Sequence, residues 1–367
     1  MDNSQEGKEQ YLDEKETATA TNKCPNCGAN MSYDIESTDL KCEHCGTTID
    51  FDESSNVQRR KMTDEITKTH DTWKEGAVFK CDNCGAKSVL DKKDLAKACP
   101  YCGSGHIVDS KELPGIKPDS VIPFQITLDS ARQRFFKWIK GKMFAPRRLK
   151  QIDNKDEHIN SMYSSSWSFS ANTSSGYQGT LGRRVTTTRY VNGRHTTTTT
   201  IKYFRVSGNI VQDYRDYFVQ SCDRIPVKMF EKIKPFNLTL LKVYRQEYLS
   251  GIIAEHYTRN IEICFNDFAA YVKRDLRHRI IRKHNADTVQ SLVVNTQYND
   301  KKFNYVLLPV YIANFKYNSK LYNFYVNGAS GKVVGKYPIS KWKVFFTSLF
   351  IGIAVGAAVA CYFIFGQ

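Results

Sequence analysis

Hydrophobic and polar residues change their period several times along the chain, and each change predicts a different element. Thr127 is a suitable N-cap for an amphipathic helix that runs to about Lys142. A longer helix is expected over about 257–284. Alternating residues with threonine on both faces predict two strands over 186–206, joined at Asn192-Gly193, a pair typical of a two-residue hairpin turn. Further strands are expected over 305–317, 320–328 and 331–337, so residues 111–340 are predicted to form an α+β domain.

The chain ends in its longest apolar run, residues 344–365, which holds no charged residue. A helix of roughly 20 apolar residues crosses a hydrocarbon core, so this run is predicted to be a transmembrane tail anchor. The alternative is a buried core helix, although such helices usually keep a polar stripe. Lysines and Trp342 precede the run, and the acidic residues 1–20, expected to be disordered, lack the apolar region of a signal peptide. We therefore expect a single-pass protein of the cell membrane with the bulk of its chain in the cytoplasm and membrane lipids among its partners.

Small residues recur every four positions in this run, at Ser348, Gly352, Gly356 and Ala360. Such a stripe lets a second helix approach closely, which predicts a packing face for a homo- or hetero-oligomer within the membrane. The alternative is that glycine and alanine are simply common in membrane spans.

Eight of the 11 cysteines follow one spacing, C-x2-C-x14-C-x2-C, which occurs twice: Cys24, Cys27, Cys42 and Cys45, then Cys81, Cys84, Cys99 and Cys102. Four thiolates in two knuckles make a tetrahedral zinc site that has no open position for substrate. A glycine follows the second cysteine of each knuckle, as at Gly28 and Gly46, where a backbone conformation that other residues resist is expected. The sequence thus predicts two structural Zn²⁺ ions in zinc ribbons over 21–52 and 77–110, joined by a helical linker over 53–76. Iron is the alternative metal, and His44 and His106 are expected to be bystanders.

Charge is divided unevenly along the chain, whose net charge is +15. Residues 1–110 hold 14 basic and 21 acidic residues, a net of −7, and the rest hold 39 and 17, a net of +22. An acidic ribbon half gains little affinity for phosphate, which favours protein docking. The excess of positive charge lies mainly in two stretches, which predict a basic surface at Arg132, Arg134, Lys137, Arg147 and Arg148 and at Arg277, Arg279, Arg282 and Lys283. Anionic lipid, an acidic protein and single-stranded nucleic acid all suit such a surface, and a solvated helix face is the simplest alternative.

Catalytic motifs are absent from the sequence. There is no G-x-x-x-x-G-K-[ST], H-E-x-x-H or G-x-S-x-G pattern. Cys222 and Cys264 are expected to be inert core residues, and the adjacent pair Glu255 and His256 is weak evidence for acid–base chemistry. No catalytic residue is therefore predicted, and the protein is not expected to be an enzyme.

Several segments together resemble one family: the duplicated "CPNCG…CEHCG" and "CDNCG…CPYCG", "LPGIKPDSVIPFQI", "WIKGKMFAP", "LLPVYIANFKY" and "YNFYVNGASGKVVGKYPISKWK". They are similar to the bacterial YdjG-like double-zinc-ribbon, tail-anchored membrane proteins, which carry labels such as TFIIB-type zinc ribbon protein or primosomal helicase-like. The resemblance implies a membrane-held accessory protein with stomatin-like or phage-shock-type partners. Here "MYSSSWSF" replaces a more apolar stretch of the family, and the helicase motor motifs are missing.

The sequence thus predicts a multi-domain protein with two small zinc ribbons, an α+β domain and one C-terminal transmembrane helix. Its expected function is that of a membrane-anchored cytoplasmic adaptor or scaffold that docks protein partners, with a role in envelope stress implied by the resemblance. The alternative is a membrane-tethered nucleic-acid-binding protein that assists replication or a helicase.

Overall fold

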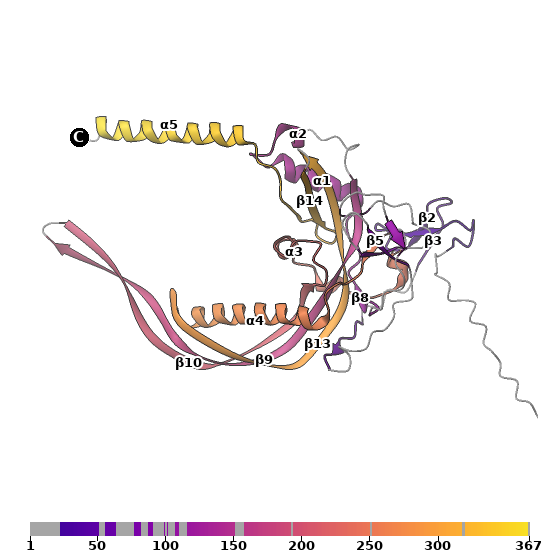
Figure 1. Ribbon diagram of the computed structural model, residues 1–367, viewed down its shortest axis with the longest axis horizontal. Coiled ribbons are helices and arrows are strands. Elements are labelled where there is room, and N and C mark those ends of the chain that lie inside the picture. The colour runs from indigo at the N-terminus through magenta and orange to yellow at the C-terminus, as the bar shows by residue number, and fades with distance from the viewer. Residues whose placement is uncertain are drawn as a thin grey trace, which may run out of the picture.

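The computed structural model describes residues 23–50, 56–63, 77–81, 87–90, 99, 101, 107–109, 116–150, 158–191, 194–249, 252–317 and 320–365. Within them, three long antiparallel strands dominate: β9 (His158–Val191), β10 (Arg194–Gln220) and β13 (Thr288–Tyr317). β9 is central, with β13 along one edge and β10 along the other. The three strands curve together into one elongated sheet (Figure 1).

The pairing of β13 with β9 starts at Thr288 opposite Gly182, whereas β10 follows β9 to the pair Val191 and Arg194. Residues 183–191 and 194–202 therefore form a two-stranded ribbon that extends past the rest of the sheet (Figure 1), and we call it the arm. Its pairing confirms the predicted hairpin, although the turn at Asn192-Gly193 lies outside the described residues.

Short strands complete the sheet on both sides. The outer edge of β13 pairs with β4 (Arg60–Lys61), β8 (Ser120–Val121) and β14 (Lys320–Asn327); β11 (Lys242–Val243) then joins β8, and β15 (Val333–Gly335) joins β14. On the other side, β9 pairs in parallel with β12 (Ile253–Glu255), which leads to β6 (Lys87–Leu90), β5 (Ala77–Cys81) and β7 (Ile107–Asp109). The second cysteine-containing segment is thus part of the main sheet.

Helix α4 (Ile261–Lys283) covers the concave face of the long strands (Figure 1). Asn260 caps its N-terminus by accepting a hydrogen bond from the backbone N–H of Ile263 at 2.9 Å. Its buried side chains recur at helical spacing and include Phe268, which stacks on Phe169 of β9. The predicted helix over 257–284 is therefore confirmed in position but starts at the Asn260 cap.

Helix α1 and four short helical segments accompany the sheet. Thr127 caps α1 (Leu128–Lys140) through the backbone N–H of Ser130, and α1 buries Ala131, Phe135 and Ile139, which confirms the predicted amphipathic helix. Short helical segments follow in the order α2 (Arg147–Lys150), α3 (Val227–Ile233), η1 (Leu238–Leu240) and η2 (Gln246–Leu249).

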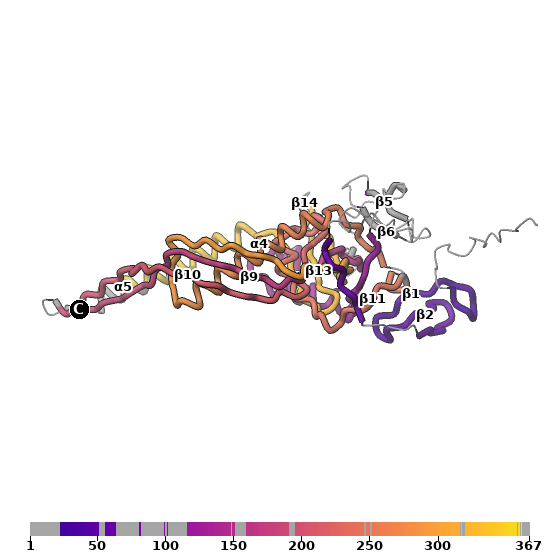
Figure 2. Tube along the Cα trace, turned by 90° about the horizontal axis from the view of Figure 1, so that it is seen from below, coloured from indigo at the N-terminus to yellow at the C-terminus, as the bar shows by residue number. Residues whose placement is uncertain are grey.

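A separate three-stranded sheet, β1 (Met31–Tyr33), β2 (Leu40–Cys42) and β3 (Thr48–Ile49), forms the N-terminal unit. It packs on the main body through Tyr33, whose ring lies 5.3 Å from that of Tyr248 in η2. Figure 2 shows this unit at the opposite end of the elongated molecule from the arm. Of the predicted helical linker 53–76, residues 56–63 contain β4 and no helix, and the rest lies outside the described residues.

Helix α5 (Lys341–Phe365) exposes apolar side chains such as Trp342 and Phe350. Within the described part of the chain, no helix is both long enough and apolar enough to cross a membrane. This finding contradicts the predicted tail anchor over 344–365 and the predicted single-pass cell-membrane location.

The predicted fold class also needs correction. The described residues are mostly β-sheet rather than an even α+β mixture, because β9, β10 and β13 continue far beyond the strands that the sequence predicted. Part of β9 could not be predicted from the pattern of hydrophobic residues because polar residues occupy buried positions there. Ser164, Ser165 and Ser166 have no exposed surface.

Candidate functional site

Four thiols of the N-terminal unit converge on one point. The Sγ atoms of Cys24, Cys27, Cys42 and Cys45 all lie within 4.8 Å of one another. Cys24 and Cys45 are 3.4 Å apart, and Cys27 and Cys42 are 3.5 Å apart. Sulfur atoms bound to one zinc ion at about 2.3 Å in a tetrahedron lie about 3.8 Å apart, so this cluster is able to hold one metal ion.

Two identical turns create the cluster. The backbone N–H of Gly28 donates to the carbonyl of Cys24 at 2.8 Å, and that of Gly46 donates to the carbonyl of Cys42 at 2.9 Å. Both glycines have a positive φ, 70° and 76°, which side chains resist. The conformation predicted for these two glycines is thus confirmed, while Gly85 and Gly103 lie outside the described residues.

Cys45 is prepared to act as a thiolate. Hydrogen bonds from the side chain and backbone of Thr47 lower the pKa of Cys45 to about 5 because both stabilise the charged sulfur. A thiolate is the form that binds metal. His44 is exposed beside this cysteine and is not part of the four-residue cluster.

The second cysteine set is described only in part. Cys81 at the end of β5 and Cys99 are both buried, 3% and 2% exposed, in the same hydrophobic cluster. Cys84, Cys102 and His106 lie outside the described residues. The predicted pair of metal sites is therefore reduced to one cluster that is able to bind one ion and two buried thiols of the second set.

A buried carboxyl group joins the second cysteine segment to the main sheet. Glu255 of β12 has no exposed surface and accepts hydrogen bonds from the hydroxyls of Tyr101 and Ser164 and from the backbone N–H of Ser165. Cys222 is a further partner. Burial raises the pKa of Glu255 despite these donors. Its hydrogen bonds connect Tyr101 of the second cysteine segment with β9 and β12 of the main sheet.

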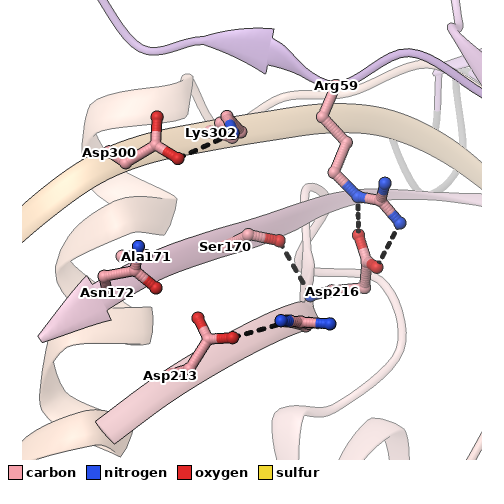
Figure 3. Close-up of a pocket in the computed structure, with 9 residues that line it drawn as sticks. Arg59, Ser170, Ala171, Asn172, Asp213, Asp216, Asp300 and Lys302 are labelled. Carbon is pink, nitrogen blue, oxygen red and sulfur yellow. Dashed lines mark hydrogen bonds and ion pairs between the residues drawn. The ribbon is translucent and has the colours of Figure 1, made fainter. Parts of the chain in front are cut away.

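Three ion pairs line a cavity of about 300 Å³ on the face of the sheet opposite α4. Arg59 donates two hydrogen bonds to the carboxylate of Asp216, at 2.8 and 2.6 Å, as Figure 3 shows. The other pairs are Arg215 with Asp213 at 2.6 Å and Lys302 with Asp300 at 2.7 Å. Because every charged group has a partner, the cavity is suited to holding segments together rather than to moving protons.

Backbone bulges create this cavity. The register of β10 shifts between Tyr214 and Tyr217, and that of β13 shifts between Asn299 and Lys302, both beside Ser170–Asn172 of β9. Asp216 and Asp300 lie in these bulges with φ of 48° and 46°. Such bulges bend and twist a sheet, and here they turn Asp216 towards Arg59 on the segment that follows the N-terminal unit (Figure 3).

A second cavity, of about 280 Å³, lies between α3, α4 and β10. Gln220 on its wall is 4% exposed, and within the described residues its side-chain amide finds no hydrogen-bond partner.

Burial raises the pKa of Cys222 and Cys264, the latter to about 12, so both thiols are unreactive, as expected of core residues.

The predicted basic residues fall on separate elements. On α1, Arg132 pairs with Asp129 at 2.6 Å. Arg134 and Lys137 of the same helix are exposed. On α2, Arg147 is exposed, and the side chain of Arg148 lies outside the described residues. On α4, Arg277 donates to the carbonyl of Leu292 at 2.6 Å and Arg279 pairs with Asp275 at 2.5 Å. Arg282 and Lys283 are exposed at the end of α4 nearest the arm. The two stretches thus do not form one surface.

The stripe of small residues lies on α5. Open space surrounds the positions where Gly352 and Gly356 would carry a Cβ atom, Ser348 is exposed, and the side chain of Ala360 lies outside the described residues. No described helix is long and apolar enough to cross a membrane, and the use of this stripe as a packing face stays a prediction.

Sequence reasoning missed both cavities and the role of Glu255. Their residues come from segments far apart in the chain, as with Arg59 and Asp216, which are 157 positions apart. The only local signal was the serine run of "MYSSSWSF", whose first two serines bind the buried carboxylate.

Comparison with known proteins gives one relative along nearly the whole chain. The protein is 30% identical over 345 residues to the uncharacterized protein YdjG of Bacillus subtilis (strain 168), which covers 92% of this chain and 95% of that protein. No family model and no solved structure matches the chain. The resemblance to YdjG is thus confirmed, whereas a double-zinc-ribbon, tail-anchored character of the family is not shown. With similarity across nearly all of both sequences, this protein belongs to the YdjG family.

Proposed function

We propose that this protein is a non-enzymatic adaptor whose N-terminal unit is held by a structural zinc ion and docks a protein partner. The observation that carries the proposal is the convergence of four thiols from two knuckles in a unit of only 28 described residues. A sheet this small has little core of its own and needs a metal to fold. Four thiolates satisfy zinc fully, so the ion has a structural rather than a catalytic role.

A second zinc ion bound by Cys81, Cys84, Cys99 and Cys102 is part of the proposal. The repeated spacing supports it, as does the burial of Cys81 and Cys99 in one cluster. Zinc is preferred over iron because the proposed role is structural and needs no redox chemistry.

The partner surface is expected on the outer face of the N-terminal unit. Residues 23–50 contain two basic and five acidic residues, a net of −3, and zinc with four thiolates adds about −2 by formal charge. Glu36 and Glu43 are exposed there. This acidity supports a partner protein with a basic surface, and it disfavours phosphate-rich ligands at this end of the molecule.

Metal content tests the zinc assignment. Full-length protein purified from zinc-replete cells should contain two zinc ions per chain by elemental mass spectrometry. The double substitution Cys27→Ser with Cys45→Ser should lose one ion, and Cys84→Ser with Cys102→Ser should lose the other. Cys361→Ser is the matched control, since Cys361 is an exposed cysteine outside both sets. Iron in place of zinc, or full metal content in either double variant, would contradict the proposal.

Quantitative crosslinking tests the adaptor role. Proteins crosslinked to the full-length chain in its native cells, after nuclease treatment, should be depleted by Glu36→Lys with Glu43→Lys. Glu262→Lys, at an exposed position in the first turn of α4, should leave them unchanged. The stomatin-like and phage-shock-type proteins implied by the sequence resemblance are the first candidates to quantify. If no protein responds to the first variant alone, the N-terminal unit is not the docking surface.

A further inference from the structure

The side chains of the arm do not cover a hydrophobic core. Beyond Gly182, β9 pairs with β10 alone, and the described arm side chains from Arg183 to Tyr190 and from His195 to Lys202 are exposed except for the half-buried Val185. An isolated two-stranded ribbon is only marginally stable in water. A ribbon that is solvated on both faces and carried on a rigid sheet is suited to contact with a partner.

Charge on the arm is of one sign. No Asp or Glu occurs between Glu157 and Asp213, whereas Arg183, Arg184, Arg189, Arg194, Lys202 and Arg205 lie in or beside the arm. Lys202 stands directly opposite Arg183 across the two strands. Like charges in that position destabilise a sheet, so a polyanion bound there would relieve the repulsion.

The basic face of the arm continues onto α4. Leu181 packs in the cluster under α4, and side chains two residues apart in a strand share a face, so Arg183 and Arg189 lie on the α4 side. Arg183 confirms this placement because it donates to the carbonyls of His284 and Asn285 just after α4 ends, at 2.8 and 3.0 Å. Arg282 and Lys283 are exposed beside it.

The acidic groups near this surface are few and engaged. The carboxylate of Asp287 accepts a hydrogen bond from the backbone N–H of Arg184 at 2.7 Å. Asp275 pairs with Arg279 and with the hydroxyl of Tyr214 at 2.7 Å. The surface from Arg282 to the arm therefore keeps a strong excess of positive charge.

We propose that the arm and the adjoining end of α4 bind double-stranded DNA, with the arm in the major groove. A B-form major groove, about 12 Å wide, admits a two-stranded β-ribbon. The arm has nine residue pairs from Arg183–Lys202 to Val191–Arg194, or about 30 Å at roughly 3.4 Å per residue, close to one turn of B-DNA.

The side chains of the arm suit this ligand. Threonine hydroxyls line both faces, with cross-strand pairs Thr186–Thr199 and Thr188–Thr197 at 3.4 Å, and threonine commonly contacts phosphates and base edges. Single-stranded nucleic acid fits less well because it needs aromatic stacking platforms. Tyr190 is an exposed arm aromatic, but its ring already meets that of His195 edge-on at 4.8 Å.

The experiment measures binding of a labelled 30-base-pair DNA duplex to the full-length protein by fluorescence anisotropy, in non-ionic detergent because α5 exposes apolar side chains. The arm variant carries Arg189→Ala and Lys202→Ala on the arm and Arg282→Ala at the adjoining end of α4, which removes three charges from the proposed surface and spares Arg183. The matched control carries Arg132→Ala, Arg134→Ala and Lys137→Ala on α1, which removes the same charge elsewhere.

Wild type and control should bind alike, whereas the arm variant should bind at least about tenfold more weakly, with its slope of log affinity against log salt reduced by about 2.7. Protection of guanine N7 from methylation, which reports on the major groove, should appear with wild type and vanish with the arm variant. Unchanged melting of the variant excludes misfolding as the cause.

Three results would overturn the inference. Equal binding of single-stranded DNA or of A-form duplex RNA, whose major groove excludes a ribbon, would show that charge alone attracts the ligand. Equal loss in the α1 control would show that the arm has no special part. Binding to vesicles with anionic lipid but not to DNA would assign the surface to lipid.

Discussion

Glu255 is an acidic residue in a fully buried environment. Its carboxyl group has no exposed surface, and its hydrogen bonds come from Tyr101, Ser164 and Ser165. Burial raises its pKa. The stability that this group contributes is therefore complete below the unfolded-state pKa of about 4.3 and is lost as pH rises through the higher folded-state value.

Replacing this carboxyl with an amide should remove that pH dependence. Glu255→Gln keeps the shape of the side chain but does not ionise. As pH rises from about 4 to 8, the free energy of unfolding of wild type should therefore fall relative to that of the variant. Urea unfolding at several pH values measures the difference. Glu262→Gln, an exposed control, should run parallel to wild type, and a parallel curve for Glu255→Gln would show that the buried group does not change its pKa on folding.

At the scale of elements, local signals were read well from the sequence and long-range pairing was not. The caps of α1 and the hairpin at Asn192-Gly193 are decided by neighbouring residues, and both helix and hairpin are present. The full lengths of β9 and β13 depend on hydrogen bonds between residues more than 100 positions apart. Polar serines in β9 fill buried positions, so alternation of hydrophobicity could not reveal that strand.

The cap of α4 offers a quantitative check at this scale. Asn260→Ala removes the acceptor for the N–H of Ile263 and should lower the free energy of unfolding by about 1 kcal/mol. Asn266→Ala is the same chemical change at an exposed position inside α4. It should be neutral or slightly stabilising because alanine has the higher helix propensity. Equal effects of the two variants in urea unfolding would refute the capping role.

For the whole molecule, the sequence revealed the uneven division of charge and one cluster of four cysteines, but not how the two cysteine segments are placed in the fold. The four thiols of the N-terminal unit come together as their spacing indicated. The second cysteine segment instead continues the main sheet through the pairing of β6 with β12, which no spacing rule contains. The predicted membrane span rested on the length and apolar composition of residues 344–365 and on the lysines and Trp342 before them, and the described helices contradict it.

Removal of metal should act on one end of the molecule first. In the described chain, β1, β2 and β3 form their own sheet and share no strand pairing with the main one. A chelator should therefore abolish hydrogen-exchange protection in 31–33 and 40–42 by mass spectrometry, while β9 and β13 keep theirs. Zinc added back should restore protection. Early loss of protection along β9 would mean that the metal supports the long sheet as well.

The order of strands has a consequence for how the protein is made on the ribosome. β4 pairs with residues 302–303, and β8 pairs with residues 306–307 as well as with β11, so neither strand reaches its place beside β13 until residues 302–307 have been translated. The first four thiols are complete once Cys45 has emerged. At about 5–20 residues per second, roughly 13 to 50 s separate these two events, so the four thiols of a nascent chain are available to a metal ion well before the long sheet exists.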